Sequence, residues 1–260
     1  MKIALVSLNQ VWEDKEVNLS LCEDYIKEAS MQKVDLIIFP EMTLTGFSTN
    51  IEKISEVESS SKTIIEFQRL SKKYNIAILF GVVIKDENKA LNRSVFVDNN
   101  GNILGIYTKI HPFTFTEEDK YFNAGNKLSV VEYQGIKIAL TICYDLRFPE
   151  LYSASSKQSD MVVNIANWPK KRVEHWNTLL KARAIENQTF VIGVNRIGTD
   201  GNSLEYKESS NIYNANGDRL ACGSFQDMKI YDVDSKFTQE FRSKFNTIND
   251  RKPKIYKEII

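Results

Sequence analysis

Three side chains that can do chemistry each stand at the end of an apolar run. Glu41 follows VDLIIFP, Lys109 ends NILGIYTK and Cys143 ends IKIALTIC. Ligand crevices of α/β proteins open beyond the ends of strands, so we expect the three side chains to converge. Together they suit nucleophilic hydrolysis, in which a cysteine attacks, a glutamate moves protons and a lysine stabilises an oxyanion.

The surroundings of Cys143 predict how its thiol is activated. A nearby cation and the N-terminus of a following helix would lower the pKa of the thiol, so we expect a thiolate nucleophile. That helix is expected to begin near Pro149, because proline is favoured in a first helical turn. The backbone N–H that follows the cysteine at the corner is a second candidate oxyanion donor.

Each candidate also has an ordinary structural interpretation. Cys143 can be a small core residue, Glu41 a helix cap or surface charge, and Lys109 a solvated strand end. A different catalytic interpretation uses His111 or His175 as the base for the cysteine. His175 precedes Trp176 at an expected helix start, which favours a packing role. Spacing alone leaves these interpretations open.

The elements that must position these side chains alternate between short apolar runs and amphipathic stretches. Asn-Gly turns predict two hairpins, at 94–109 and 211–223, so part of each sheet should be antiparallel. The order of elements is similar in the two halves, which indicates a helix–sheet–sheet–helix sandwich in one α/β domain. Strands are expected at 3–8, 34–40, 76–84, 136–143, 160–167 and 189–198, and helices at 17–31, 63–74, 148–157 and 174–188.

Composition argues against several classes of function. Lys plus Arg and Asp plus Glu both number 34, so bulk charge favours neither nucleic acid nor an anionic membrane. Three cysteines do not make a disulfide framework, and two histidines without a CxxC or HExxH motif argue against a metal site. The basic run 170–172 is interpreted as a solvated helix start. The apolar run at the N-terminus is too short for a signal peptide, and we expect a cytoplasmic protein.

Three segments resemble the glutamate, lysine and cysteine segments of the nitrilase, or carbon–nitrogen hydrolase, superfamily. They are FPEMTLTGFS (39–48), YTKIHPF (107–113) and TICYDLRFPELY (141–152). The resemblance continues in order through NIANWP (164–169), the segment 175–202 and NGD (216–218). It implies a four-layer αββα sandwich formed by a single domain of residues 1–260. It also implies hydrolysis of non-peptide C–N bonds through a thioester, with no metal or organic cofactor.

The resemblance assigns a catalytic role to one side chain in each of the three segments. Cys143 matches the nucleophile, Glu41 the general base and Lys109 the oxyanion lysine, with the backbone N–H of Tyr144 as second donor. Asp145 is expected to fix the loop rather than to react.

A second, supporting glutamate usually follows the lysine segment of the family. Glu117 and Glu118 are adjacent here, and Glu118, seven residues before Gly125, fits the family pattern better. Glu118 therefore completes the expected catalytic set, with Glu117 as the alternative.

The chain is similar to the omega-amidase branch in CYDLRFPE, NWP, HW, LLKARAIENQ and GTDGN. That branch hydrolyses the terminal amide of 2-oxoglutaramate or 2-oxosuccinamate and releases ammonia. Arg147 suits bidentate binding of a substrate carboxylate, or else an ion pair with Glu150 or Asp145. Phe113 and Trp168 are expected to wall a small pocket, or else to belong to ordinary core. Proline at 112, where the family often has leucine, puts the shape of that wall in question.

Other interpretations stay open within the family. The amide substrate can instead be deaminated glutathione or a carbamoyl amine, and a catalytically silent member would act as a binding protein. The family implies a homodimer, and the C-terminal segment 241–260 is interpreted as crossing its interface. The expected partner is thus a small-molecule amide, with neither nucleic acid nor a membrane.

Overall fold

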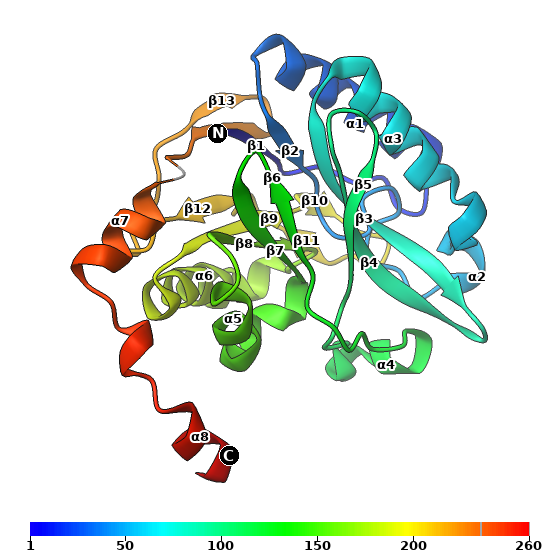
Figure 1. Cartoon of the computed structure of the whole chain (residues 1–260). Coiled ribbons are helices and arrows are strands. Elements are labelled where there is room, and N and C mark those ends of the chain that lie inside the picture. Colours follow the sequence, from blue (N-terminus) through cyan, green and yellow to red (C-terminus); the bar gives the residue numbers. More distant parts are fainter. Residues whose placement is uncertain (235, 260) are drawn as a thin grey trace.

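The structure, a computed structural model, describes residues 1–234 and 236–259; Ser235 and Ile260 lie outside the described residues. Two large sheets stack face to face, and helices cover their outer faces (Figure 1). The expected four-layer αββα sandwich is confirmed by this arrangement.

The first large sheet has seven strands in the order β13-β14-β1-β2-β3-β4-β5. β1 pairs in parallel with β2, and β2 with β3, while the other neighbours are antiparallel. The strands are β1 Lys2–Val6, β2 Leu36–Ile38, β3 Ala77–Asp86, β4 Lys89–Val97, β5 Ile103–Thr108, β13 Gly223–Phe225 and β14 Met228–Asp232.

The second large sheet has five strands in the order β12-β9-β8-β7-β6, and β10 and β11 form a separate small pair. β7, β8 and β9 run in parallel. The strands are β6 Val130–Tyr133, β7 Ile136–Ile142, β8 Met161–Ala166, β9 Phe190–Asn195, β10 Gly198–Thr199, β11 Glu205–Tyr206 and β12 Asn211–Tyr213.

Helices form the outer layers and the connections. α1 and α3 lie on the seven-stranded sheet, and α5 and α6 on the five-stranded sheet (Figure 1). The helices are α1 Lys15–Met31, α2 Ile51–Ile54, α3 Lys62–Tyr74, α4 Glu118–Tyr121, α5 Pro149–Ser156, α6 Val173–Asn187, α7 Phe237–Lys244 and α8 Pro253–Ile259. Short 3-10 helices span Glu58–Ser60, Thr114–Thr116, Cys143–Arg147, Lys170–Arg172 and Ile248–Asp250.

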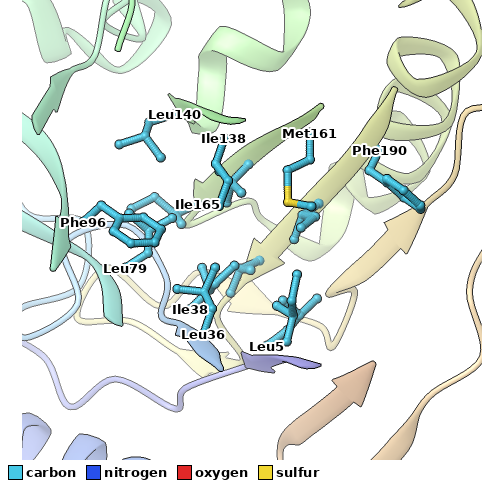
Figure 2. Close-up of a cluster of buried hydrophobic side chains, with 14 of the residues drawn as sticks. Leu5, Leu36, Ile38, Leu79, Phe96, Ile138, Leu140, Met161, Ile165 and Phe190 are labelled. Atoms are coloured by element: carbon cyan, nitrogen blue, oxygen red, sulfur yellow. The ribbon is translucent and has the colours of Figure 1, made fainter. Parts of the chain in front are cut away.

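The strands are apolar on both faces because both faces are covered. In β1, Ile3 and Leu5 point into the core between the sheets, while Ala4 and Val6 point toward α1 and α3. This follows from the two-residue period of a strand, and strands buried on both faces read as continuous apolar runs. Figure 2 shows side chains from both sheets meeting in the central core.

The two Asn-Gly turns behave differently. The expected hairpin at 94–109 forms as β4 and β5, although β4 begins earlier, at Lys89. The expected hairpin at 211–223 is wrong beyond its turn, where a bridge joins Tyr213 to Arg219. β12 pairs with β9, whereas β13 pairs with β14 in the other sheet. The chain thus crosses between sheets there, because each flanking segment finds its partner strand elsewhere.

Candidate active site

Strand ends deliver the three expected residues to one place. Glu41 lies three residues after β2, Lys109 directly after β5, and Cys143 directly after β7. Lys109 and Cys143 line one pocket, and Glu41 is fully buried against Lys109. The convergence expected from the sequence is therefore present in the structure.

The buried cluster has Lys109 at its centre. Its Nζ donates to both carboxylate oxygens of Glu118, at 2.9 and 2.8 Å, and to Oε1 of Glu41 at 3.2 Å. Glu118 also accepts from the backbone N–H of Phe113 at 2.6 Å. Of the two candidate glutamates, the structure places Glu118 in the cluster, whereas Glu117 is exposed and pairs with Lys120.

Two asparagines that the sequence did not single out hold Glu41 in place. Asn92 of β4 donates to Glu41 Oε1 at 2.7 Å and reaches Glu118 at 3.3 Å. The backbone N–H of Asn167 donates to Glu41 Oε2 at 2.9 Å, and its side chain donates to the backbone carbonyl of Glu41. Asn167 lies in the segment NIANWP, but Asn92 gives no local signal, because only the pairing of β3, β4 and β5 brings it inward.

Cys143 sits at a sharp corner. Its φ is +47°, in the left-handed region that non-glycine residues seldom adopt and that often marks functional sites. A 3-10 helix, Cys143–Arg147, begins at once and separates the corner from α5. Tyr144 is the second residue of that helix, and the first N–H groups of a helix lack partners within it. The N–H of Tyr144 is thus available to a ligand beside the thiol.

Asp145 fixes this corner, as expected. Its buried carboxylate accepts from the backbone N–H of Ile142 at 3.0 Å and from the hydroxyl of Tyr107 at 2.7 Å. It also accepts from the backbone N–H of His111 at 3.1 Å, and the His111 ring lies 2.8 Å from it. One carboxylate therefore joins the end of β7 to the segment that follows Lys109.

Burial governs the ionisation of the cluster. Burial and the neighbouring charge of Glu41 raise the pKa of the Cys143 thiol well above its ordinary value, despite the opposing effect of Lys109. The expectation of a lowered thiol pKa is therefore wrong, because desolvation outweighs the nearby cation. Burial also opposes the charge on Lys109, but the carboxylates of Glu118 and Glu41 outweigh it and raise the pKa of Lys109. Burial and Glu41 raise the pKa of Glu118.

A pocket opens above Cys143 and encloses about 500 Å³ of empty space, including the part open to solvent. Phe113, Tyr144, Arg147 and Trp168, all expected at the site, line it. The sequence reasoning missed other lining residues, and it interpreted the basic run ending at Arg172 as a solvated helix start. The missed residues are Phe47, Thr116, Asn167, Pro169, Arg172, Leu204 and Tyr206.

The contacts of Arg147, His111 and His175 distinguish between the roles that the sequence left open. Within the described residues, Arg147 forms no ion pair with Glu150 or Asp145; it donates to Nδ1 of His175 at 3.3 Å. His111 contacts Asp145 and stacks on Phe148, with ring centroids 3.7 Å apart. Neither imidazole hydrogen-bonds to Cys143 in the described part of the chain, so the geometry gives no support to a Cys–His pair.

Two statements about metal ions and membranes hold for residues 1–234 and 236–259. No group of three or more His, Cys, Asp or Glu side chains there is placed to hold a metal ion. No helix in the same ranges is long and apolar enough to cross a membrane.

Comparisons with known proteins give a consistent result. The family model for carbon-nitrogen hydrolase matches residues 2–243. The chain is 32% identical to omega-amidase YafV of Escherichia coli over 96% of both chains. It is 34% identical to 2-oxoglutaramate amidase of Paenarthrobacter nicotinovorans, over 93% of this chain and 85% of that one. A CN-hydrolase superfamily protein of Xanthomonas campestris, solved with an arsenic adduct in its active site, aligns with a TM-score of 0.89 at 30% identity, over 97% of each chain. This chain therefore belongs to the carbon–nitrogen hydrolase family.

Proposed function

We propose that this enzyme is a cysteine-dependent amidase that hydrolyses the terminal amide of a small carboxylate-bearing substrate, namely 2-oxoglutaramate or 2-oxosuccinamate. The proposal rests on a catalytic cluster and a carboxylate-binding arginine that share one pocket. The buried cluster of Glu41, Lys109 and Glu118 meets Cys143 at the base of a pocket, and Arg147 lines the same pocket. The omega-amidase and 2-oxoglutaramate amidase names of the relatives support the choice of substrate.

The first half of the proposed reaction forms a thioester. Because burial keeps the Cys143 thiol protonated, Glu41 accepts its proton as the sulfur attacks the amide carbon. Lys109 Nζ and the N–H of Tyr144 hold the oxyanion that results. As the C–N bond breaks, Glu41 returns the proton to the nitrogen, and ammonia leaves.

The second half hydrolyses the thioester. Water attacks the acyl carbon and gives its proton to Glu41, and the oxyanion again lies between Lys109 and Tyr144. The C–S bond then breaks, the Cys143 sulfur takes the proton from Glu41, and the carboxylic acid product leaves and gives its remaining proton to solvent. Glu118 serves to hold Lys109 in place and charged, since it accepts two hydrogen bonds from Nζ.

The far end of the substrate is assigned to the outer part of the pocket. Arg147 suits a carboxylate because a guanidinium matches two carboxylate oxygens in one plane. Phe113 and Trp168 form apolar walls for the short chain between the amide and the carboxylate. A nitrile or a neutral amide would give Arg147 no carboxylate to bind.

The exposed C-terminal helix and the free cysteines bear on the assembly and location of the protein. We propose a homodimer, because apolar side chains of α8 are exposed: Ile255 is 52% exposed and Ile259 is 72% exposed. α8 extends away from the body of the molecule (Figure 1). A cytoplasmic location is supported by Cys22, Cys143 and Cys222 being free thiols, as a reducing compartment keeps them.

Ammonia release tests the substrate. The purified chain is expected to release ammonia from 2-oxoglutaramate and 2-oxosuccinamate, and far more slowly from glutamine, deaminated glutathione, a carbamoyl amine or a simple nitrile. If the enzyme preferred another amide, its assignment as an amidase would stand, but the proposed substrate would be wrong. No release from any amide, with a folded protein, would favour a binding role instead.

A further inference from the structure

Two guanidinium groups line the active-site pocket. Arg147 ends the 3-10 helix that begins at Cys143, and Arg172 ends a second 3-10 helix just before α6. Neither forms an ion pair with an Asp or Glu within the described ranges 1–234 and 236–259. By contrast, the preceding Lys170 pairs with Glu205 at 2.6 Å. The pocket therefore carries two positive charges without carboxylate partners.

Aromatic rings hold both guanidinium groups. The Cζ of Arg147 lies 4.9 Å from the Trp168 ring centroid, and the Cζ of Arg172 lies 5.5 Å from the Phe113 ring centroid. Trp168 Nε1 also donates to the backbone carbonyl of Arg172 at 2.7 Å. A ring face positions a guanidinium while leaving its N–H groups at the edge free to donate.

Tyr144 contacts both of these ring–guanidinium pairs, and together they form one wall of the pocket. Its ring centroid lies 4.6 Å from that of Phe113 and 5.9 Å from the Cζ of Arg147. The same residue supplies the N–H beside Cys143. The two arginines are therefore built into the wall that flanks the nucleophile, rather than into a separate surface patch.

We infer that Arg172 is a second anion-binding residue of the substrate pocket and acts with Arg147 on the end of the substrate remote from the amide. This inference rests on the proposed function. A 2-oxo acid presents three acceptor oxygens at that end, two on the carboxylate and one on the adjacent carbonyl. One guanidinium satisfies two of them in a bidentate pair, and a second guanidinium reaches the third. The pair thus favours 2-oxo acid amides over amides with a lone carboxylate.

The test compares an anionic and a neutral substrate in Arg172→Met. For 2-oxoglutaramate, kcat/KM is expected to fall roughly 10- to 100-fold, mainly through KM, because a charge-assisted hydrogen bond is lost. For butyramide, which lacks a carboxylate, kcat/KM should change less than about twofold. Arg172→Lys keeps the positive charge but not the planar guanidinium, so its loss in kcat/KM for 2-oxoglutaramate should be smaller. Lys171→Met removes an exposed charge from the neighbouring position and should leave both substrates unaffected.

A third substrate, glutaramate, tests the role of the 2-oxo oxygen. The wild type should prefer 2-oxoglutaramate to glutaramate, and Arg172→Met should narrow that preference. Equal losses on 2-oxoglutaramate and butyramide, or no loss on either, would overturn the inference while leaving the proposed function intact. If the wild type does not prefer carboxylate-bearing amides to butyramide, the proposed function fails and the inference falls with it.

Discussion

At the scale of single residues, the central feature is a neutral thiol beside charged neighbours. Burial and Glu41 raise the pKa of the Cys143 thiol, so the nucleophile carries its proton near neutral pH. A thiolate formed in advance would sit in a buried space beside the Glu41 and Glu118 carboxylates, which is unfavourable. The proposed mechanism instead pairs attack with proton transfer to Glu41, whose carboxylate is already oriented by Asn92 and Asn167.

Replacing Glu41 separates the acidity of the thiol from catalysis. Glu41→Gln removes a negative charge that raises the pKa of the Cys143 thiol, so the thiol should ionise at lower pH than in the wild type. The pH midpoint of Cys143 alkylation by iodoacetamide, followed by mass spectrometry of its peptide, should therefore shift downward. Ammonia release should nevertheless be lost, because no group is left to move the proton.

The exposed Cys222 is an internal control for that experiment, since its alkylation should have the same pH dependence in both proteins. An alkylation midpoint that stays in place or rises in Glu41→Gln would contradict the assigned effect of Glu41 on the thiol.

At the scale of elements, one carboxylate sets the relation between two strand ends. Asp145 accepts hydrogen bonds from Ile142 at the end of β7 and from His111 in the segment after β5. Tyr107, in β5 itself, donates to the same carboxylate. These bonds hold Cys143 at its left-handed φ and keep the lysine segment beside it. Asp145 thus acts as a positioning residue.

Asp145→Asn should therefore damage turnover more than binding. The N–H of Ile142 bonds to Oδ2 and the N–H of His111 to Oδ1, and an amide replaces one of these two acceptors with an NH2 donor. We expect kcat to fall roughly 100-fold, as a displacement of about 1 Å at a reacting atom would cause, with KM changed less than about threefold. Steady-state kinetics and a thermal unfolding curve would measure this. The same change at the exposed Asp119 should be silent, and a loss confined to KM would contradict the positioning role.

A second carboxylate joins two outer helices. Glu56 accepts from Lys15 of α1, from Ser61 at the N-cap of α3, and from the backbone N–H of Thr63. Burial opposes its charge, but these hydrogen bonds outweigh burial and lower the pKa of Glu56 from its ordinary 4.5. A lowered pKa means that the stabilisation is present above about 4.5 and is lost as pH falls through the folded-state value.

Glu56→Gln should lower the free energy of unfolding at pH 7 by about 1 to 3 kcal/mol, because bonds to a charged acceptor are weakened. The difference from the wild type should shrink as pH falls below about 4.5. Urea denaturation at several pH values would measure it, with the exposed Glu52→Gln as control. A difference that stayed constant with pH would contradict the assigned ionisation.

An element or site residue could be predicted from the sequence where a local pattern marks it, and not where only the folded chain sets its surroundings. β1, β7, β8 and β9 read as apolar runs because both faces are buried, and the end of β7 placed Cys143 correctly. Asn92 was missed because a polar residue within a strand has no local mark of its inward direction. Arg172 was misread because the run 170–172 looks like a solvated helix start, and only the folded chain lays its guanidinium on Phe113.

At the scale of the whole molecule, the C-terminal arm, residues 246–259, makes the proposed dimer testable. Arg251 donates to Asn187 at 2.9 Å and to the backbone carbonyl of Glu186, so the arm begins against α6. Beyond it, Ile255 and Tyr256 of α8 remain exposed. A second copy that covers these apolar side chains would account for them.

A chain that ends at Lys252 should therefore associate less tightly than the full chain. In sedimentation velocity we expect the full chain at twice 29.9 kDa and the shortened chain at or near the monomer mass. Arg251 remains in the shortened chain, so the α6 contacts serve as an internal control for folding. A monomeric full chain would contradict the homodimer, and an equally stable shortened dimer would remove α8 from its interface.

The central claim is that hydrolysis passes through a thioester on Cys143. The most direct measurement mixes the wild type with 2-oxoglutaramate, quenches in acid within milliseconds to seconds, and locates any acyl adduct by peptide mass spectrometry while ammonia is counted. We predict an adduct on the Cys143 peptide that forms with the first equivalent of ammonia, and neither adduct nor ammonia from Cys143→Ala. Ammonia released at the wild-type rate by Cys143→Ala, or an adduct on a different residue, would contradict the claim.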